Sequence, residues 1–438
     1  MNIIKPSVLP GFMDLLPKDQ LVFNKMKEII EDNFKKFAYL PLDTPAIEKT
    51  EILLAKGGGE TSKQVYNIES SSRNMSMRFD LTVPLARFVA EHYHELEFPF
   101  RRYHIGKVYR GERNQRGRFK EFYQCDIDII GDEFLDIRND AEIPLVIYNI
   151  FKELNFTEMT FHLNNRKLLN GFLDYHGIDN FTEVLRIIDK IAKVSEQDIK
   201  EMLSDIIPEV DKVELILQFI SYKGENTDVL NYLEELKIDN DKYSEGLKEL
   251  SEVYKYMRLF EIPDENICLD MSITRGLDYY TGTVYETFLD NYKSIGSVCS
   301  GGRYDDLASN YTKKSLPGIG ISIGLTRLFY QLNEADLIDI PTRSVADVVI
   351  YPMADCYEYG VKVVDKLRDE GIIAQIYFEP GKFKKKLNYA NKLNIPYIII
   401  LGDDELSKDE VALKDMDTGE QISVCIDEAI KIIHSNKL

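Results

Sequence analysis

The residues with the clearest chemistry lie between positions 101 and 131, where basic side chains precede a run of carboxylates. Residues 101–120 carry eight Lys or Arg against one Glu, a local charge of +7 in a chain whose formal net charge is −20. The guanidinium fork of arginine suits phosphate oxygens, whereas carboxylates and an amide carbonyl accept hydrogen bonds from an amine. This combination predicts a site for a polyphosphate beside an amine. The alternative is a salt-bridged sheet surface.

The pattern around this cluster predicts the element that positions it. Hydrophobic and polar residues alternate on both sides of the glycine-containing segment 112–118, as in a long antiparallel β-hairpin. On the returning strand Gln124, Asp126 and Asp128 share one face, and the intervening apolar residues share the other. One face therefore belongs to the core, and the other forms a floor rich in hydrogen-bond acceptors.

Length and composition predict a globular chain of two or three domains. The 438 residues are 44% hydrophobic, and no apolar run approaches the roughly 20 residues that span a bilayer. Without a secretory pattern at the N-terminus, we expect a cytoplasmic protein with no membrane partner. The five widely spaced cysteines favour reduced thiols. His92 and His94, with His104 and His162 elsewhere, lack a third ligand at metal spacing and predict no protein-held metal.

Four segments resemble motifs of class II aminoacyl-tRNA synthetases. YRGERNQRGRFKEFYQCDIDIIG, residues 109–131, resembles the second signature motif in the form found in the histidyl-tRNA synthetase family, especially its archaeal and eukaryotic-like branch. GFMDLLP with the following helix and strand resembles the first motif, and PGIGISIGLTRLF the third. RGLDYYTG, residues 275–282, resembles a motif specific to this family and its close paralogues.

The resemblance implies activation of histidine by ATP with Mg²⁺, followed by transfer of histidine to tRNA(His), with no prosthetic group. Carried over position by position, it assigns the α-phosphate of ATP to Arg110 and Arg275. It assigns the β- and γ-phosphates to Arg118 and Arg327. Glu112 is assigned to the adenine or a Mg²⁺ ion.

The resemblance also assigns a set of residues to histidine: Asp80, Thr82, Gln124, Asp128, Arg275, Tyr279 and Tyr280. The first three would hold the α-amino group, and Asp128 with the two tyrosines would receive the imidazole. MRFDLTVPLAR, residues 77–87, predicts a strand that stops near Pro84, which would place Asp80 and Thr82 on one face. A structural role at the N-terminus of the following helix is the alternative for either residue.

The implied fold class is α/β (α+β), with a class II catalytic domain on a mainly antiparallel sheet. We expect this domain at residues 1–338, a helical insertion at about 173–260, and a C-terminal α/β anticodon-binding domain at 345–438. The first class II motif implies a homodimer. The lysines of KFKKKL suit a phosphate backbone, with a solvated helix face as the alternative; they are Lys382, Lys384, Lys385 and Lys386.

A second interpretation is a histidine-binding protein without catalysis, similar to the regulatory subunit of ATP phosphoribosyltransferase. That paralogue typically lacks the C-terminal domain and parts of the arginine set. This chain retains the arginines and the additional domain, so the synthetase interpretation is favoured. An isoelectric point near 4.9 argues that any nucleic-acid contact uses local patches rather than a broad basic surface.

Overall fold

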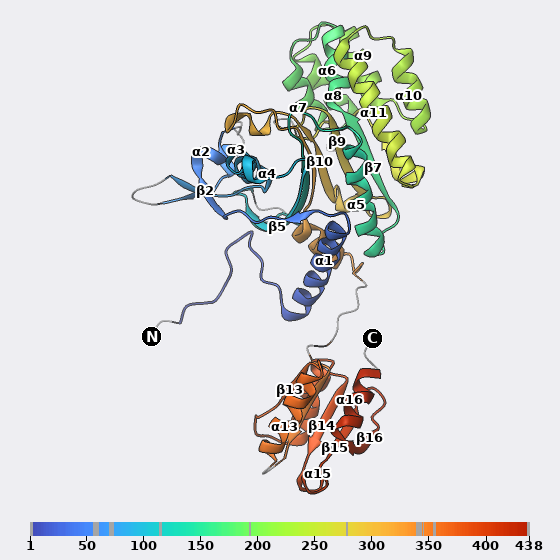
Figure 1. Ribbon diagram of the computed structural model, residues 1–438. Helices are drawn as coiled ribbons and strands as arrows, with labels where there is room; N and C mark the ends of the chain where they lie inside the picture. Colours follow the sequence, from blue (N-terminus) through green and yellow to red (C-terminus); the bar gives the residue numbers. More distant parts are fainter. Residues whose placement is uncertain are drawn as a thin grey trace. The chain divides into compact units, whose positions relative to one another are not determined.

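A long antiparallel hairpin supplies two strands of the main sheet, as its alternating sequence predicts. Strand β5 (Phe100–Tyr109) pairs along its whole length with β6 (Glu121–Ile130). The computed structural model describes residues 3–55, 61–69, 74–113, 116–191, 194–276, 279–338, 344, 346–353 and 356–435. The chain divides into two compact units, Met1–Ile340 and Pro341–Leu438, and Figure 1 labels many of their helices and strands.

Eight described strands form the main sheet of the first unit. Neighbouring strands are antiparallel except at the two edges, where β1 pairs with β5 and β8 with β7 in parallel. In spatial order they are β1 (Leu40–Pro41), β5, β6, β11 (Gly318–Ile323), β10 (Cys299–Tyr304), β9 (Thr283–Leu289), β7 (Met159–Asn165) and β8 (Ile267–Leu269). The prediction of a mainly antiparallel sheet is therefore confirmed.

Helices α1 and α5 cover the apolar face of this sheet. Helix α1 (Pro17–Lys36) begins with a proline, whose missing N–H is tolerated in the first turn, and buries residues spaced three or four apart. Helix α5 (Asn139–Glu153) packs beside it. Both belong to the hydrophobic core that includes Cys125, Ile127 and Ile129 of β6. The apolar face predicted for β6 is confirmed.

Six described helices join β7 to β8. They are α6 (Arg166–Tyr175), α7 (Phe181–Ile188), α8 (Glu196–Ser204), α9 (Val210–Ser221), α10 (Asn226–Glu235) and α11 (Asp241–Leu259). Figure 1 shows this green and yellow bundle standing beside the sheet edge that carries β7. Its buried side chains continue the core of the sheet, so the bundle and the sheet form one hydrophobic cluster.

The strand predicted to stop near Pro84 is wrong. Strand β4 (Met75–Met77) ends earlier, and Thr82 is the first residue of helix α4 (Thr82–Glu91). Proline has no N–H and a fixed φ that suits the first helical turn, so Pro84 does not prevent a helix there. Asp80 and Thr82 therefore lie at the start of a helix and not on one face of a strand.

The remaining elements of the first unit are short. A small sheet holds β2 (Ile47–Lys49), β4 and β3 (Asn67–Ile68) in that order. The other α-helices are α2 (Thr50–Leu53), α3 (Thr61–Gln64) and α12 (Leu325–Glu334). Short 3₁₀ helices occupy Tyr93–Glu95, Asp264–Asn266, Asp290–Ile295 and Leu307–Asn310. Helix α12 directly follows β11, so the segment that resembles the third motif runs from a strand into a helix.

The second unit is a five-stranded sheet with helices on both faces. Its strands, in spatial order, are β13 (Ala374–Ile376), β12 (Val348–Pro352), β14 (Tyr397–Leu401), β15 (Glu410–Asp415) and β16 (Gln421–Cys425). The first three are parallel and the last two antiparallel. Its helices are α13 (Tyr357–Asp369), α14 (Phe383–Lys392), α15 (Asp403–Lys408) and α16 (Ile426–Ser435). Alternate residues of β12 enter two separate hydrophobic clusters, as a strand covered on both faces requires.

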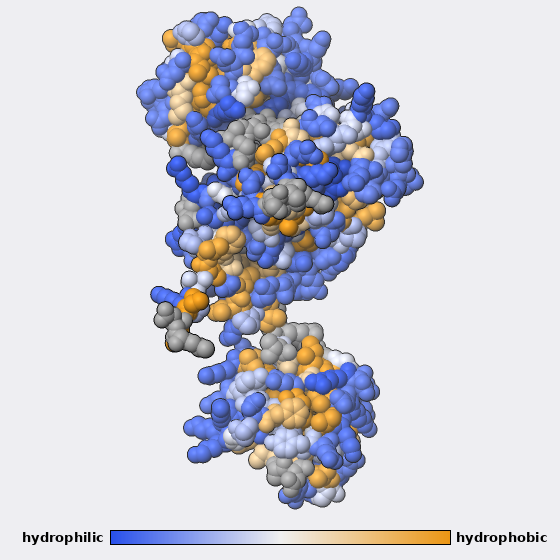
Figure 2. Space-filling view, turned by 90° about the vertical axis from the view of Figure 1, so that its left-hand side faces the viewer, coloured by the Kyte–Doolittle hydropathy of each residue, from blue (hydrophilic) through white to orange (hydrophobic). Residues whose placement is uncertain are grey.

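The face of the molecule drawn in Figure 2 is mostly hydrophilic, and hydrophobic residues interrupt it in patches. Several exposed apolar side chains come from the N-terminal part of the chain, including Ile3, Ile4, Leu9, Leu16 and Leu40. Among the described residues we find no helix whose length and apolar character would let it span a lipid bilayer.

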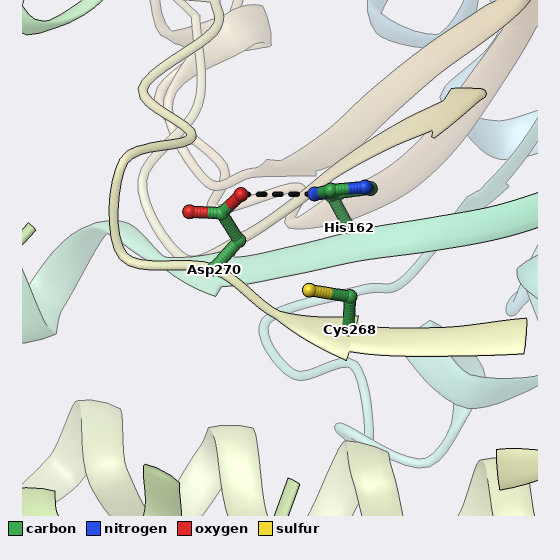
Figure 3. Close-up of side chains that lie close together, drawn as sticks. All are labelled: His162, Cys268 and Asp270. Carbon is green, nitrogen blue, oxygen red and sulfur yellow. Dashed lines mark hydrogen bonds and ion pairs between the residues drawn. The ribbon is translucent and has the colours of Figure 1, made fainter. Parts of the chain in front are cut away.

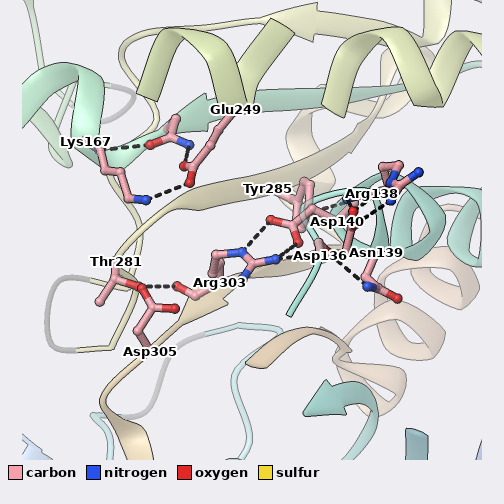
Figure 4. Close-up of polar contacts among 11 residues, drawn as sticks. Asp136, Arg138, Asn139, Asp140, Lys167, Glu249, Thr281, Tyr285, Arg303 and Asp305 are labelled. Atoms are coloured by element: carbon pink, nitrogen blue, oxygen red, sulfur yellow. Dashed lines mark hydrogen bonds and ion pairs between the residues drawn. The ribbon is translucent and has the colours of Figure 1, made fainter. Parts of the chain in front are cut away.

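A buried ion pair joins the sheet to α5. The Nη2 and Nε atoms of Arg303 donate to the two carboxylate oxygens of Asp140 at 2.7 and 3.1 Å, and both side chains are almost completely buried (Figure 4). Tyr285 donates its hydroxyl to the Asp140 carbonyl. A two-bond pair of this kind fixes the orientation of both partners. The ion pair therefore fixes the position of β10 relative to α5.

Candidate active site

A cavity of about 340 Å³ lies beside the β5–β6 hairpin of the first unit. Its lining brings together six of the residues predicted for the site: Arg110, Glu112, Arg118, Gln124, Arg275 and Arg327. These residues come from the end of β5, the hairpin loop, β6, the segment before β9, and α12. Four guanidinium groups around one cavity form a site suited to several phosphate oxygens.

Each of these arginines is held by a neighbour. The Nε of Arg110 donates to the Phe79 carbonyl at 2.9 Å, and the Nη1 of Arg118 donates to Glu112 Oε2 at 2.9 Å. Arg327 donates to a backbone carbonyl of the segment before β10, and its Nε is buried without a hydrogen-bond partner among the described residues. The guanidinium groups are therefore oriented while keeping donors for a ligand.

Arg275 is paired with a residue that the motifs did not indicate. Its Nη2 lies 2.9 Å from Oε1 of Glu286, which also lines the cavity from β9. Positions 277 and 278 of the RGLDYYTG motif lie outside the described residues. Glu286 sits four residues beyond that motif on a strand, and no pattern in the sequence marked it as a partner.

The floor of the hairpin is more deeply buried than predicted. Asp128 on β6 is 3% exposed, and both of its carboxylate oxygens are occupied. Arg102, its register partner on β5, lies 2.7 Å from Oδ2, and the Tyr304 hydroxyl donates to Oδ1 at 2.7 Å. Arg102 is itself completely buried. Asp128 lies beside the lining of the cavity rather than in it.

A neighbouring glycine makes room for this carboxylate. A Cβ atom on Gly320 of β11 would lie 2.1 Å from Oδ1 of Asp128. Gly320 is the register partner of Asp128, so its missing side chain leaves the space that Asp128 occupies. Glycine at position 320 therefore allows β11 to pack beside the Asp128 carboxylate of β6.

Burial raises the pKa of the floor carboxylates. Burial is the largest cause of a raised pKa for Asp126, to about 7, and for Asp128, to about 6; Arg102 opposes both shifts. Asp128 further raises the pKa of Asp126. The pKa of Asp80 is raised as well, again mainly by burial. Asp80, Asp126 and Asp128 are thus buried in one region, and Arg102 is directly paired with Asp128. This excess of buried carboxyl groups favours the binding of a proton or a cation.

Two of the residues predicted to bind the α-amino group, Asp80 and Thr82, lie where the chain turns into α4. Asp80 Oδ1 accepts a hydrogen bond from the Val83 N–H at 3.0 Å, which is the structural helix-start role given as the alternative. Thr82 is half-buried at the first position of α4. Gln124 donates from Nε2 to Ser322 Oγ at 2.8 Å, and its Oε1 is buried without a partner in the described part of the chain.

The two tyrosines of the RGLDYYTG motif lie against the hydrophobic cluster that contains Tyr304. Gly276 has φ +68, and a Cβ there would meet the Tyr280 ring at 2.1 Å, so glycine lets this ring pack under the backbone. Burial, followed by Asp128, raises the pKa of Tyr280. Tyr280 therefore lies close to the carboxylate floor.

The lysines predicted for the second unit do not form one exposed set. Lys382 precedes α14, and Lys384 and Lys385 on its first turn are exposed. Lys386 is buried, at 5% exposure, with its Nζ 5.7 Å from the centre of the Tyr351 ring. The expectation that all four lysines face a phosphate backbone is wrong for Lys386, whose stem packs in the core.

Comparison with known proteins decides the family. A family model described as histidyl-tRNA synthetase matches residues 11–328, and one described as anticodon binding domain matches residues 347–436. The histidine–tRNA ligase of Clostridium tetani is 56% identical over 433 residues, covering 99% of both chains. The chain belongs to the histidyl-tRNA synthetase family. The Finegoldia magna ligase is 51% identical, covering 98% of this chain and 99% of the relative.

Solved structures agree with membership of the histidyl-tRNA synthetase family. The histidyl-tRNA synthetase of Nostoc sp. PCC 7120 is 34% identical with a TM-score of 0.88, and both chains are covered completely. A Bacillus halodurans C protein titled as an ATP phosphoribosyltransferase regulatory subunit/histidyl-tRNA synthetase shares the fold at 18% identity, with a TM-score of 0.77 over 91% of this chain and 99% of that one. The curated relatives named above are bacterial. The expected membership of an archaeal and eukaryotic-like branch is therefore not supported.

The buried floor generates a prediction about stability. Asp126 has a pKa of about 7 in the folded chain against an ordinary value of 3.8, so its contribution to stability is complete below about pH 4 and is lost as pH rises to about 7. Asp126→Asn removes this loss. We expect the unfolding free energy of the variant, relative to the unmodified chain, to increase by up to about 1.4 kcal/mol per pH unit between pH 5 and 7.

The measurement is urea unfolding followed by circular dichroism at several pH values. Asp32→Asn, on the exposed side of α1, is the matched control for exchanging a carboxylate for an amide. A variant-to-parent difference that is the same at pH 5 and pH 7 would show that Asp126 does not exchange a proton in this range.

Proposed function

We propose that this chain activates histidine with ATP to form histidyl-adenylate and pyrophosphate, and then transfers histidine to the 3′ end of tRNA(His). The observation that carries this proposal is the cavity ringed by Arg110, Arg118, Arg275 and Arg327 beside the buried carboxylate floor. The non-catalytic paralogue is less well supported, because the arginine set is complete and an anticodon binding domain matches residues 347–436.

The first step joins a carboxylate oxygen of histidine to the α-phosphorus of ATP, and pyrophosphate leaves from the opposite side. Such a step needs alignment of the two reactants and stabilisation of the developing charge. Arg110 and Arg275 are proposed to hold the α-phosphate, with Arg118 and Arg327 on the β- and γ-phosphates. Their fixed neighbours keep the guanidinium groups in place before ATP arrives, which reduces the reorganisation required during reaction.

Histidine recognition is proposed to use the buried floor. The free Oε1 of Gln124 offers an acceptor to the α-amino group, and a cationic amino group would compensate the buried carboxyl group of Asp80, whose pKa burial raises. Asp128, with Tyr279 and Tyr280, is proposed to receive the imidazole. Oδ1 of Asp128 already accepts a hydrogen bond from Tyr304 and Oδ2 is paired with Arg102, so an imidazole N–H must share one of these oxygens with its present partner or displace that partner.

The family implies a metal ion with ATP, and two carboxylates of the cavity fit a hard divalent cation. Glu112 and Glu286 both line the cavity and offer oxygen ligands of the kind that Mg²⁺ prefers. We propose that Mg²⁺ enters with ATP and neutralises part of its phosphate charge. Both carboxylates are already paired with arginines, so they would act as partners of a phosphate-bound ion rather than as a separate cage.

The two units are proposed to divide the work. We assign catalysis to residues 1–338, including the insertion at about 173–260, and tRNA reading to residues 345–438. Support comes from the division of the chain after Ile340 and from the exposed lysines around the start of α14. We further propose a cytoplasmic location. We also propose a homodimer, because apolar side chains such as Ile4 and Leu9 are exposed near the N-terminus and a second subunit would bury them.

The proposal predicts which amino acid supports ATP–pyrophosphate exchange. Each of the twenty amino acids should be assayed separately with ATP, Mg²⁺ and labelled pyrophosphate. Histidine alone should give exchange, and the same preparation should charge tRNA(His). Exchange with none of the twenty, by a folded chain that binds histidine, would instead identify the non-catalytic paralogue.

A second prediction tests the phosphate clamp. Arg110→Lys replaces a planar two-bond donor by a point charge, so we expect the exchange rate to fall by about a hundredfold or more. Arg116→Lys is the matched control, since Arg116 is highly exposed and neither it nor its partner Glu334 lines the cavity. A folded Arg110→Lys chain that keeps the rate of the control would remove Arg110 from the clamp.

A further inference from the structure

Three residues with different metal-binding atoms meet on the outer strands of the main sheet. His162 lies on β7, Cys268 on β8, and Asp270 directly after β8; one ligand atom from each lies within 4.8 Å of the others. Figure 3 shows the bond from His162 to Asp270 and the Cys268 side chain beside it. From the sequence alone His162 is predicted to be isolated, because Cys268 and Asp270 occur more than a hundred residues later.

Strand pairing brings the three side chains to one face. His162 and Cys268 are register partners in the parallel β7–β8 pair, so their side chains project from the same side of the sheet. Asp270 is two residues beyond Cys268 and continues that side. Oδ2 of Asp270 lies 2.9 Å from Nδ1 of His162. The cluster is thus built from the backbone register and not from flexible surface side chains.

We propose that His162, Cys268 and Asp270 bind one divalent transition-metal ion, and that Zn²⁺ is the ion they fit best. A thiolate, an imidazole nitrogen and a carboxylate oxygen are the three ligand types that Zn²⁺ takes in proteins. With water as a fourth ligand they would complete a tetrahedral site. Ca²⁺ and Mg²⁺ are disfavoured, because both prefer oxygen ligands only.

The surroundings of Asp270 suit a ligand whose orientation is fixed. Its Oδ1 accepts hydrogen bonds from the backbone N–H and the hydroxyl of Ser272 at 3.0 and 2.6 Å, and Lys223 Nζ lies 2.7 Å away. These contacts hold one oxygen and leave Oδ2 directed at His162, as expected for a ligand supported by outer contacts. Lys223 is 57% exposed on its side chain, so its ammonium group can move away from an incoming cation.

The same cluster already attracts a positive charge. Burial lowers the pKa of His162, but hydrogen bonds with Asp270 and Cys268 outweigh it and raise that pKa to about 9. Glu286, the register partner of His162 on β9, lies beside it on the same face of the sheet, and Lys223 is the nearby cation.

The site would strengthen the base of the loop that carries Arg275. The side-chain amide of Asn164, on β7, donates to the carbonyls of Met271 and Ile273, so β7 already holds this loop at two points. A metal bound between β7 and Asp270 adds a third fixed point just before it. The cluster does not line the cavity, and its role is thus structural support of the site rather than contact with substrate.

Metal binding to the full chain gives the test. The purified chain is stripped with EDTA, dialysed, and titrated with Zn²⁺ alone in competition with a chromophoric chelator. We expect one equivalent bound with a dissociation constant below about 1 µM at pH 8. Co²⁺ in place of Zn²⁺ should give a thiolate charge-transfer absorption band.

Substitutions assign the ligands. Cys268→Ser and His162→Gln should each weaken Zn²⁺ binding by at least about a hundredfold, and Cys268→Ser should abolish the Co²⁺ band. Cys425→Ser is the matched control, because Cys425 is an exposed thiol in the second unit. No tight equivalent in the unmodified folded chain, or unchanged binding in Cys268→Ser, would overturn the proposal. Circular dichroism of each variant establishes that a loss of binding is not a loss of folding.

Discussion

Arg102 and Asp128 face each other across the β5–β6 hairpin, 2.7 Å apart and shielded from solvent. Transferring two charges from water to this position is costly, and removing one partner alone would leave an uncompensated buried charge. Two neighbouring residues accommodate the buried carboxylate. The Tyr304 hydroxyl donates a hydrogen bond to the second oxygen of Asp128, and Gly320 leaves the space that this carboxylate occupies. Strands β5, β6, β10 and β11 are thus tied together at one buried carboxylate.

This arrangement separates two kinds of chemistry in the histidyl-tRNA synthetase site. The arginines that line the cavity remain available to solvent and to phosphates, while the carboxylates lie deeper, where burial raises their pKa values. Low local polarity strengthens the interaction of such carboxylates with a bound amine or imidazole. We propose that ATP and histidine meet at the boundary between this basic rim and the acidic floor.

The features that the sequence predicts correctly are those recorded by the spacing of neighbouring residues. Alternation predicted the hairpin, and the positions of Gln124, Asp126 and Asp128 on one face followed from a two-residue period. Arg102 could have been found by continuing that pairing back along β5. The pattern does not predict the start of α4 at Thr82, because the first turn of a helix tolerates a proline such as Pro84. The burial of Lys386 and the approach of His162 to Cys268 depend on packing between distant segments, which no local spacing records.

The central claim is that Asp128, held between Arg102 and Tyr304, receives the imidazole of histidine. Calorimetric titration of histidine into Asp128→Asn tests it most directly, because the substitution keeps the shape of the side chain and removes its charge. We expect histidine affinity to fall by at least about tenfold, as for a lost hydrogen bond to a charged group, with ATP affinity unchanged. Asp132→Asn, on exposed backbone beyond β6, should leave both affinities unchanged. Unaltered histidine affinity in a folded Asp128→Asn chain would contradict the account.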